Sequence, residues 1–439
     1  MPRFLLATLQ TGARRVTRAH CQALLSAGLV SLLFAGVPER KSSFRSNSAV
    51  LQQNAKGYKW DFGNVSGLDS REIPFEFDSN HVFLQGTVNS SGPLWFTLDT
   101  GASGTLIATK RAQALGLNLR GGIRTEGAGG TVESFLVSDV SLGLPGASLP
   151  DLDITAVSLD GLESNFGRPV DLILGSELFR RYVVEIDYAA KVLRLYEPGS
   201  YQYHGTGEVL PITLHENHPF VRASIETAGA KAIPNEFVID VGSGFCVLLQ
   251  RNFIEAHREL QSLREVLKTD VAGIGGSVPV AISRLGRLRL GRVSILAPVT
   301  IFPRTSKGSF ALKPMAGNIG NEILRRFKVT FDYSRLRMIL EPNNDFDEPN
   351  DYDMSGISLV AERPTFRVFR IERILENSPA TDAGLRVGDS IVELDRRPVA
   401  DLGLGKLRKM FKQPGRVYDL TVQRGGNAFN VKLKLRRLI

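Results

Sequence analysis

Cysteine is scarce in this sequence of 439 residues. The two cysteines are Cys21 and Cys246, and Cys21 lies in an N-terminal segment with the features of an export signal. A chain that loses this segment keeps one thiol, which excludes an internal disulfide framework. Stability must therefore come from packing, and a content of 43% apolar residues is enough for several compact domains.

The sequence also lacks the features that indicate membrane-spanning, nucleic-acid-binding or metal-binding proteins. No apolar run after residue 40 approaches the 20 or so residues that span a bilayer. The net charge of +9 is not accompanied by basic residues interleaved with stacking aromatics, so no nucleic-acid partner is expected. His215 and His218 lie three residues apart without a cysteine or acidic cluster. We interpret them as a turn at a strand edge and expect neither a metal nor another cofactor.

The N-terminal segment 1–37 is predicted to be a signal peptide or an N-terminal anchor. It contains four arginines and no acidic residue, followed by an apolar run over residues 23–37. An organellar transit peptide is the alternative interpretation. We expect an exported protein, periplasmic or secreted, that is attached to the membrane if the segment stays uncleaved. Residues 38–72 are polar and irregular and are predicted to be a spacer.

Glycine and proline are abundant, with 43 and 21 residues, and they separate short runs of alternating polarity. Such runs, bounded by turn-forming residues, are typical of strands rather than long helices. We therefore predict a mostly-β protein. Cys246 lies in one of the apolar runs, which predicts a buried small residue rather than a nucleophile.

The most informative feature is an internal repeat with a period of about 140 residues. Each copy contains an apolar run that ends in aspartate, then a Gly-rich segment, then an apolar pair followed by glycine. In the first copy these elements are 95–101, 127–130 and 172–175, and in the second copy 237–242, 273–276 and 317–320. After that glycine the copies align without a gap, from Gly175 and Gly320 to Tyr188 and Tyr333. We expect the copies to pack as a pseudo-twofold pair within a monomer.

The repeat divides the chain into predicted domains. The first half spans residues 73–198 and the second half residues 199–342. Residues 343–356 are acidic and rich in turn-forming residues, which indicates a linker. A separate module is predicted over residues 357–439.

Asp99 and Asp240 occupy equivalent positions at the ends of the two apolar runs. If the copies pack about a twofold axis, the two carboxylates can meet across it. Like charges a few ångströms apart cannot both ionise cheaply, so the pair would share a proton and supply one base and one acid. Such a pair can direct a water molecule onto a peptide carbonyl without a metal or a covalent intermediate. Gly101 and Gly242 permit the tight turns that aim backbone N–H groups at the carboxylates.

The segment 99–103, with Asp99, Thr100 and Gly101, resembles the active-site signature of pepsin-like and retroviral aspartic peptidases. The resemblance extends at motif level over residues 73–342 and implies two tandem retropepsin-like β-barrel halves. It implies Asp99 and Asp240 as catalytic residues acting on a peptide or protein substrate, with their loops supported by Thr100, Gly101, Gly242 and Ser243. The Gly-rich segments resemble flaps, which gives these expected flap residues: Gly127, Gly129, Gly130, Gly273, Ile274, Gly275 and Gly276.

Val241 departs from the family pattern. The family has Thr or Ser after the aspartate, whose hydroxyl bonds across the twofold axis, and Ser243 cannot be assumed to replace it. The alternative to an endopeptidase is therefore an inactive scaffold that binds extended peptides in the same cleft.

The C-terminal module resembles a bacterial PDZ domain. The resemblance is carried by Ser-Pro-Ala at 378–380, Ala-Gly-Leu at 383–385 and Gly-Asp at 388–389. It implies that a peptide C-terminus adds as a strand to a sheet edge. By this analogy Phe366, Arg367 and Val368 would hold the terminal carboxylate, and residues 402–411 would form the helical wall of the groove. A packing domain without a ligand is the alternative.

Overall fold

The computed structural model describes residues 70–227, 231–261, 263, 267–305 and 315–439. The predicted signal segment 1–37, and the spacer up to residue 69, lie outside these ranges. The first described strand, β1 (Ser70–Pro74), pairs with β11 (Val192–Tyr196). Residues 70–72, which the sequence assigned to the spacer, therefore belong to a sheet. Among the described residues, no helix is long and apolar enough to span a membrane.

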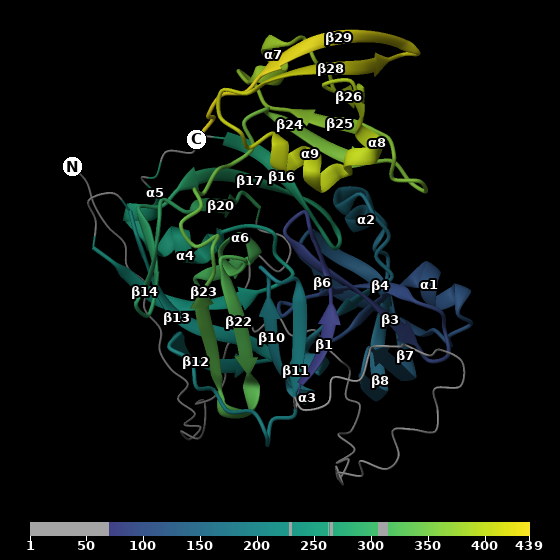
Figure 1. Cartoon of the computed structure of the whole chain (residues 1–439), viewed down its shortest axis with the longest axis vertical. Coiled ribbons are helices and arrows are strands. Elements are labelled where there is room, and N and C mark those ends of the chain that lie inside the picture. Colours follow the sequence, from purple (N-terminus) through teal and green to yellow (C-terminus); the bar gives the residue numbers. More distant parts are fainter. Residues whose placement is uncertain (1–69, 228–230, 262, 264–266, 306–314) are drawn as a thin grey trace, which may run out of the picture.

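The fold is mostly β, as predicted, and comprises a large body and a smaller C-terminal module that lies on top of it in Figure 1. The first repeat forms an eight-stranded sheet. In spatial order its strands are β2 (Glu76–Asp78), β3 (His81–Val88), β4 (Leu94–Leu98), β9 (Leu172–Leu174), β5 (Leu106–Ala108), β8 (Ala147–Val157), β7 (Gly130–Leu144) and β6 (Arg120–Gly127). Its helices are α1 (Thr109–Ala114), α2 (Asp160–Phe166) and α3 (Ser176–Arg181).

The second repeat lies in a fifteen-stranded sheet that also takes in the edge of the first repeat. Its path is β1, β11, β10 (Val183–Asp187), β22 (Phe327–Asp332), β23 (Arg337–Pro342), β12 (Glu208–His215), β13 (His218–Glu226), β14 (Ile233–Asp240), β21 (Gly317–Gly320), β15 (Val247–Leu249), β20 (Val299–Pro303), β17 (Gly276–Arg284) and β16 (Leu267–Gly273). Off this path, β18 (Arg287–Leu290) pairs with β13, and β19 (Val293–Leu296) pairs with β18. Its helical segments are α4 (Arg251–Ala256), α5 (Arg258–Gln261), α6 (Asn321–Leu324) and the 3-10 turn η2 (Tyr333–Arg335).

Strands β10 and β22 join the two repeats as an antiparallel pair. Val184 faces Phe331, and Ile186 faces Val329. In the sequence repeat Val184 is the counterpart of Val329 and Ile186 that of Phe331, so the two contacts interchange when the repeats are exchanged. This is the register that a local twofold axis between the strands produces.

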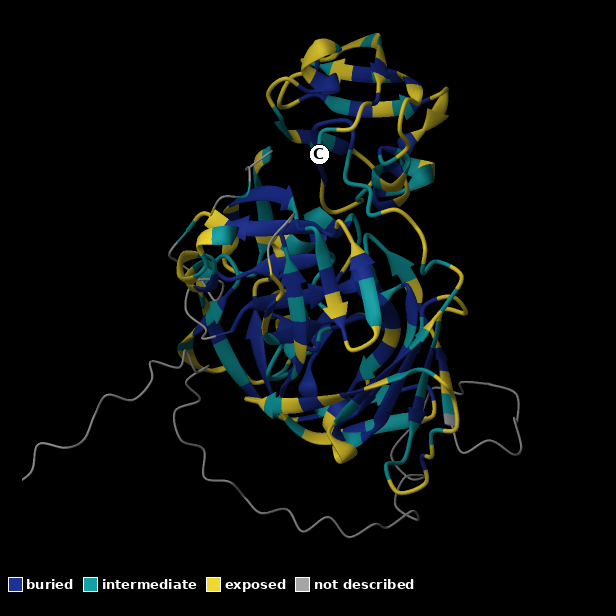
Figure 2. Ribbon diagram, turned by 90° about the vertical axis from the view of Figure 1, so that its left-hand side faces the viewer, coloured by how far each residue is buried: buried dark blue, intermediate teal, exposed yellow. Residues whose placement is uncertain are grey.

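The two repeats share one hydrophobic core, whereas the C-terminal module has its own. Phe179 of the first repeat lies edge-on to Phe331 of the second, with ring centroids 5.3 Å apart. A pair of this kind contributes about 1 kcal/mol beyond the area that it buries. Figure 2 shows buried strands inside both bodies and exposed segments along their rims. The repeats are therefore held together by shared packing as well as by the sheet.

The C-terminal module is a six-stranded sheet with three short helices. Its strands are β24 (Ile357–Ala361), β25 (Phe369–Ile374), β26 (Ser390–Leu394), β27 (Arg397–Pro398), β28 (Val417–Arg424) and β29 (Asn427–Lys434), and its helices are α7 (Pro379–Asp382), α8 (Val399–Leu402) and α9 (Leu404–Met410). Strand β24 is an edge of this sheet.

The segment 343–356, predicted to be a linker, lies against the second repeat. The buried guanidinium of Arg326 donates to the carbonyl oxygens of Phe346 and Glu348 and to the side chain of Asn350. A buried arginine needs such acceptors because an unsatisfied charge in the interior is costly. These bonds fix the path of the chain between the large body and the C-terminal module.

Candidate active site

Two aspartate loops, residues 99–103 and 240–244, meet at the centre of the large body. Asp99 follows β4, and Asp240 is the last residue of β14. Each of these strands pairs in parallel with a second buried strand of its own repeat, β9 or β21. An apolar run of this kind forms a strand that is buried on both faces. The end of each run therefore fixes the point at which its aspartate leaves the sheet.

Each aspartate is held by a backbone N–H group of its own loop. Gly101 N donates to Asp99 Oδ1 at 2.7 Å, and Gly242 N donates to Asp240 Oδ1 at 3.0 Å. The glycines also lie against the opposite carboxylates. A Cβ atom at Gly101 would lie 2.7 Å from Asp240 Oδ1, and one at Gly242 would lie 2.2 Å from Asp99 Cγ. Only glycine leaves room for the two carboxyl groups to face each other.

The close approach changes the titration of Asp99. Burial raises the pKa of Asp99 well above its usual range, and the charge of Asp240 and a hydrogen bond between the two side chains raise it further. Desolvation and a neighbouring like charge both disfavour the charged form of a carboxyl group. The pair is therefore suited to hold one proton in common, with Asp99 as the protonated member.

Asn318 distinguishes the two aspartates and was not among the site residues predicted from the sequence. Its Nδ2 donates to Asp240 Oδ2 at 2.6 Å inside the protein, where Asn318 is 9% exposed. The equivalent position of the first repeat is Ile173, which offers no donor. A hydrogen bond donated to a carboxylate favours its ionised form. The signal in the sequence was a polar residue in one copy where the other copy has an apolar one.

If the aspartate pair catalyses peptide cleavage, as the sequence predicts, Asn318→Ile should lower kcat/KM by roughly tenfold to a hundredfold, since a hydrogen bond to a charged group contributes about 1.5–3 kcal/mol. Initial rates over a range of substrate concentrations measure this effect. Ile173→Val, at the equivalent position, should change kcat/KM less than about twofold. An unchanged kcat/KM for Asn318→Ile would show that Asp240 does not need this hydrogen bond.

Thr100 links the two loops across the twofold axis. Its Oγ1 donates to Ile239 O at 2.6 Å and accepts from Val241 N at 2.9 Å. Val241, the residue equivalent to Thr100, is buried and has no hydroxyl group with which to bond to the first loop. Its carbonyl instead accepts from Asn321 Nδ2 at 2.6 Å. The side-chain oxygen of Ser243 lies beside Gly320 of its own repeat.

The two Gly-rich segments are the turns of two hairpins, β6–β7 and β16–β17. Their tips touch: Gly129 N donates to Ile274 O at 2.8 Å. A Cβ atom at Gly127 would lie 2.3 Å from Ile274 O, and one at Gly275 would lie 2.2 Å from Gly130 O. The structure thus brings the predicted flap residues of both repeats together, and their glycines are needed because the two backbones approach so closely.

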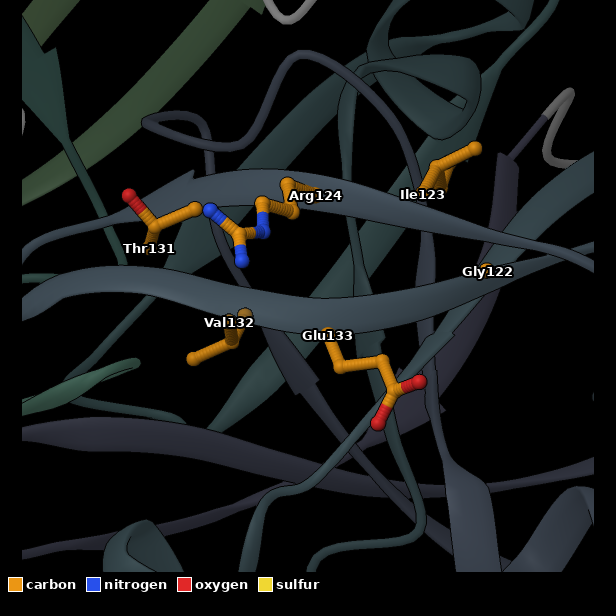
Figure 3. Close-up of a pocket in the computed structure, with 6 residues that line it drawn as sticks. All are labelled: Gly122, Ile123, Arg124, Thr131, Val132 and Glu133. Atoms are coloured by element: carbon orange, nitrogen blue, oxygen red, sulfur yellow. The ribbon is translucent and has the colours of Figure 1, made fainter.

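An open pocket lies on the first of these hairpins (Figure 3). It is lined by Gly122, Ile123, Arg124, Thr131, Val132 and Glu133. Neither aspartate lines it, so this hollow belongs to the outer part of the hairpin rather than to the aspartate pair.

In the C-terminal module, Phe366, Arg367 and Val368 lie in the loop that joins β24 to β25. Phe366 packs against the core of the module, and Arg367 pairs with Asp401 at 3.2 Å. At the other end of β24, the N–H groups of Ser355 and Gly356 donate to the Asp353 carboxylate. Peptide binding by the loop 366–368 stays a prediction.

Helix α2 of the first repeat lies against the edge strand β24, beside helix α9. A Cβ atom at Gly167, just after α2, would lie 2.8 Å from Leu404 Cβ and 3.6 Å from Ala361 Cβ. Arg408 of α9 donates to Asn165 O and, at the strand edge, to Leu359 O. The end of α2 therefore occupies the groove between β24 and α9.

Helix α9 also contacts the turn between β2 and β3. A Cβ atom at Gly405 would lie 1.7 Å from Asp78 Oδ1. Lys412, just beyond α9, bonds to Glu322 Oε2 at 2.9 Å, and Asn80 of the turn donates to the same oxygen. Burial raises the pKa of Glu322, but Lys412 and Arg325 outweigh it and lower this pKa to about 2. The module is thus joined to both repeats next to the aspartate loops.

We predict that Gly405→Leu separates the C-terminal module from the large body. The larger side chain cannot fit against Asp78, whereas leucine favours the helical state over glycine by roughly 0.8 kcal/mol, so α9 itself should persist. Limited proteolysis within residues 343–356 should become faster. Lys406→Leu, at an exposed position of the same helix, is the control. Equal cleavage rates in the two variants would contradict the prediction.

Two protein-family models match parts of the chain. Residues 84–178 match the model of a family described as aspartyl protease, and residues 355–435 match the model of the PDZ domain. The first match contains Asp99 and β9 but not Asp240. No curated protein matches the chain. The chain therefore carries an aspartyl protease domain and, at its C-terminus, a PDZ domain, and the family resemblance predicted from the sequence is confirmed for these two ranges.

Proposed function

We propose that the chain is an aspartic endopeptidase whose active site combines Asp99 of the first repeat and Asp240 of the second. The observation that carries the proposal is the contact of the two carboxyl groups, with the pKa of Asp99 raised by burial and by Asp240. A pair that shares one proton provides a base and an acid at a single point, which is the requirement for adding water to an amide.

In the proposed reaction, Asp240 is the base and Asp99 the acid. Asp240, ionised and bonded to Asn318, takes a proton from a water molecule between the carboxyl groups. The water oxygen attacks the peptide carbonyl carbon, and Asp99 gives its proton to the carbonyl oxygen. The proton on Asp240 then moves to the amide nitrogen as the C–N bond breaks, while a hydroxyl proton of the intermediate returns to Asp99. The products are a carboxylic acid and an amine, and the pair regains its starting state.

The joined hairpin tips support an extended peptide as the substrate. We propose that the hairpins open to admit the chain and then close over it, because their turns consist mainly of glycine and only the side chain of Ile274 packs against a hydrophobic cluster. In the same proposal the enzyme is a monomer, exported through the N-terminal segment 1–37. The PDZ domain binds peptide C-termini only when the end of α2 leaves the groove between β24 and α9.

The proposal is tested by incubating residues 38–439 with a diverse peptide library from pH 3 to 8 and identifying new termini by mass spectrometry. We expect internal cleavage that survives metal chelation and serine- or cysteine-directed reagents. Peptides that bind without being cut, by a protein shown to be folded, would overturn the proposal in favour of a peptide-binding scaffold.

A further inference from the structure

Two hairpin turns carry the same pair of residues, one turn in each repeat. The turn between β2 and β3 ends at Asn80, and His81 is the first residue of β3. The turn between β12 and β13 ends at Asn217, and His218 is the first residue of β13. In both turns the asparagine and the residue before it have positive φ, at 60° for Asn80 and 68° for Asn217. This is the geometry of a tight two-residue hairpin, in which asparagine is favoured. The turns are therefore equivalent in sequence and in conformation.

Each histidine reaches the aspartate loop of the other repeat. His81 Nε2 lies 3.1 Å from Gly242 O, and His218 Nε2 lies 2.9 Å from Gly101 O. The second nitrogen of each ring faces a carbonyl of its own turn, with His81 Nδ1 2.7 Å from Ser79 O and His218 Nδ1 3.2 Å from His215 O. Each imidazole thus bridges its own hairpin and the opposite aspartate loop. Burial lowers the pKa of His81 to about 4, so its ring is neutral at pH 7 and its single N–H can donate to only one of the two carbonyls.

The two asparagines also bind carbonyls of the opposite aspartate loops, two residues after each glycine. Asn80 Nδ2 donates to Gly244 O at 2.9 Å, and Asn217 Nδ2 donates to Ser103 O at 3.3 Å. The carbonyls of both loops are therefore bound at equivalent positions, always from the opposite repeat. Such reciprocal contacts are what a twofold relation between two self-complementary surfaces produces.

We propose that His81 and His218 are positioning residues, each of which carries a proton on Nε2 and donates it to the glycine carbonyl of the opposite repeat's aspartate loop. The inference rests on the proposed peptidase function, which it extends from the aspartates to the groups that hold them in register.

The bound carbonyls belong to the glycines whose N–H groups hold the aspartates. Gly101 is fixed through its N–H by Asp99 and through its carbonyl by His218, and Gly242 is fixed in the same way by Asp240 and His81. With both polar groups of one residue bonded, the loop has little freedom to rotate. A displacement of about 1 Å at reacting groups can cost a hundredfold in rate, so such restraint has a direct effect on catalysis.

Packing keeps both rings in place. His218 is 5% exposed. The ring of His81 lies 4.4 Å from that of Phe166 at the end of α2, and its turn is covered by helix α9 of the PDZ domain at Gly405. The first turn is thus supported by the PDZ domain, whereas the second turn is bonded to the first repeat through Asn217 and His218. Loss of the PDZ contact should weaken the hold on residues 240–244 more than that on residues 99–103.

The test compares leucine and glutamine at each histidine. The glutamine amide can donate to the glycine carbonyl from nearly the position of the imidazole Nε2, whereas leucine keeps the bulk but cannot. For His81→Leu and His218→Leu we expect kcat to fall about a hundredfold while KM changes less than about threefold. His81→Gln and His218→Gln should recover most of that loss. His215→Leu, an exposed histidine beside the second turn, should behave as wild type.

Amide hydrogen exchange supplies a readout that does not depend on cleavage. His218→Leu should increase exchange in residues 99–103 of the first repeat, and His81→Leu in residues 240–244 of the second. If the wild-type protein does not cleave peptides, the proposed function fails, and this crosswise pattern alone decides the positioning role. If His218→Leu does not fold, it is replaced by His218→Asn, whose amide is too short to reach the Gly101 carbonyl. Faster exchange confined to the repeat that carries the substitution, or equal kcat for leucine and glutamine, would overturn the inference.

Discussion

Asp99→Asn is expected to abolish peptide cleavage and, at pH 7, to raise the melting temperature. The amide cannot donate the proton that the carbonyl oxygen needs, and loss of such a group costs up to about 10⁴-fold in rate. We expect a loss of about 10³-fold or more in kcat/KM. The amide is also neutral at every pH, so the substitution removes the cost of burying a second carboxyl group beside Asp240.

The pH dependence of this stabilisation follows from the direction of the pKa shift. Burial and Asp240 raise the pKa of Asp99, so above pH 3.8 the unfolded chain releases a proton that the folded protein keeps. The stability that the protonated group contributes is complete below pH 3.8 and is lost as the pH rises toward the folded pKa. Thermal melts of wild type and Asp99→Asn should therefore coincide near pH 3 and separate by about 2–4 °C for each kcal/mol at pH 7.

Asp240→Asn tests the second member of the aspartate pair. It should also abolish cleavage, because Asp240 is the proposed base. Retention of more than a tenth of the wild-type kcat/KM by either variant would contradict the two-aspartate mechanism. Asp99→Asn melting below wild type at pH 7 would contradict the proposed cost of burying the pair.

Gly242→Ala is expected to inactivate the protein nearly as strongly, without removing a reacting group. The added Cβ would lie 2.2 Å from Asp99 Cγ, a distance that can be relieved only by moving the Asp99 carboxyl group or one of the two aspartate loops. Either movement separates the two carboxyl groups. We expect kcat/KM to fall at least a hundredfold, measured beside the melting temperature.

Gly161→Ala is the control for this substitution. A Cβ atom at Gly161 meets nothing within 4 Å, and alanine favours the helical state of α2 over glycine by up to about 1 kcal/mol. This variant should cleave as wild type does. Gly242→Ala retaining activity within tenfold of wild type would show that the two carboxyl groups do not need their close approach.

Much of the architecture could be predicted because it is periodic in the sequence. The apolar runs before Asp99 and Asp240 form buried strands, since such runs leave few alternatives in a mostly-β chain. The Gly-rich segments form hairpin turns for a similar reason. Close approach of two backbones requires glycine, and glycine can be read directly from the sequence. Each aspartate turn and each flap tip was therefore predictable as a local structure.

The partners of individual side chains could not be predicted in the same way. Asn318 interrupts an apolar strand, and only the pairing of β14 with β21 shows that it faces Asp240. His218 was interpreted as part of a simple strand-edge turn, because its partner, the Gly101 carbonyl, lies far away in the sequence. Likewise, nothing in the sequence of α2 indicates that its end fills the groove of the PDZ domain.

The sequence by itself determined the class of the fold, the internal repeat, the two aspartates and the aspartyl protease and PDZ resemblances, because these depend on residue type and spacing along the chain. The tertiary structure decided which carboxyl group Asn318 contacts, that the Asn-His turns cross to opposite repeats, and that the PDZ domain covers one of them. Such contacts join residues far apart in sequence, and their energies depend on distances of a few ångströms that only the packed chain defines.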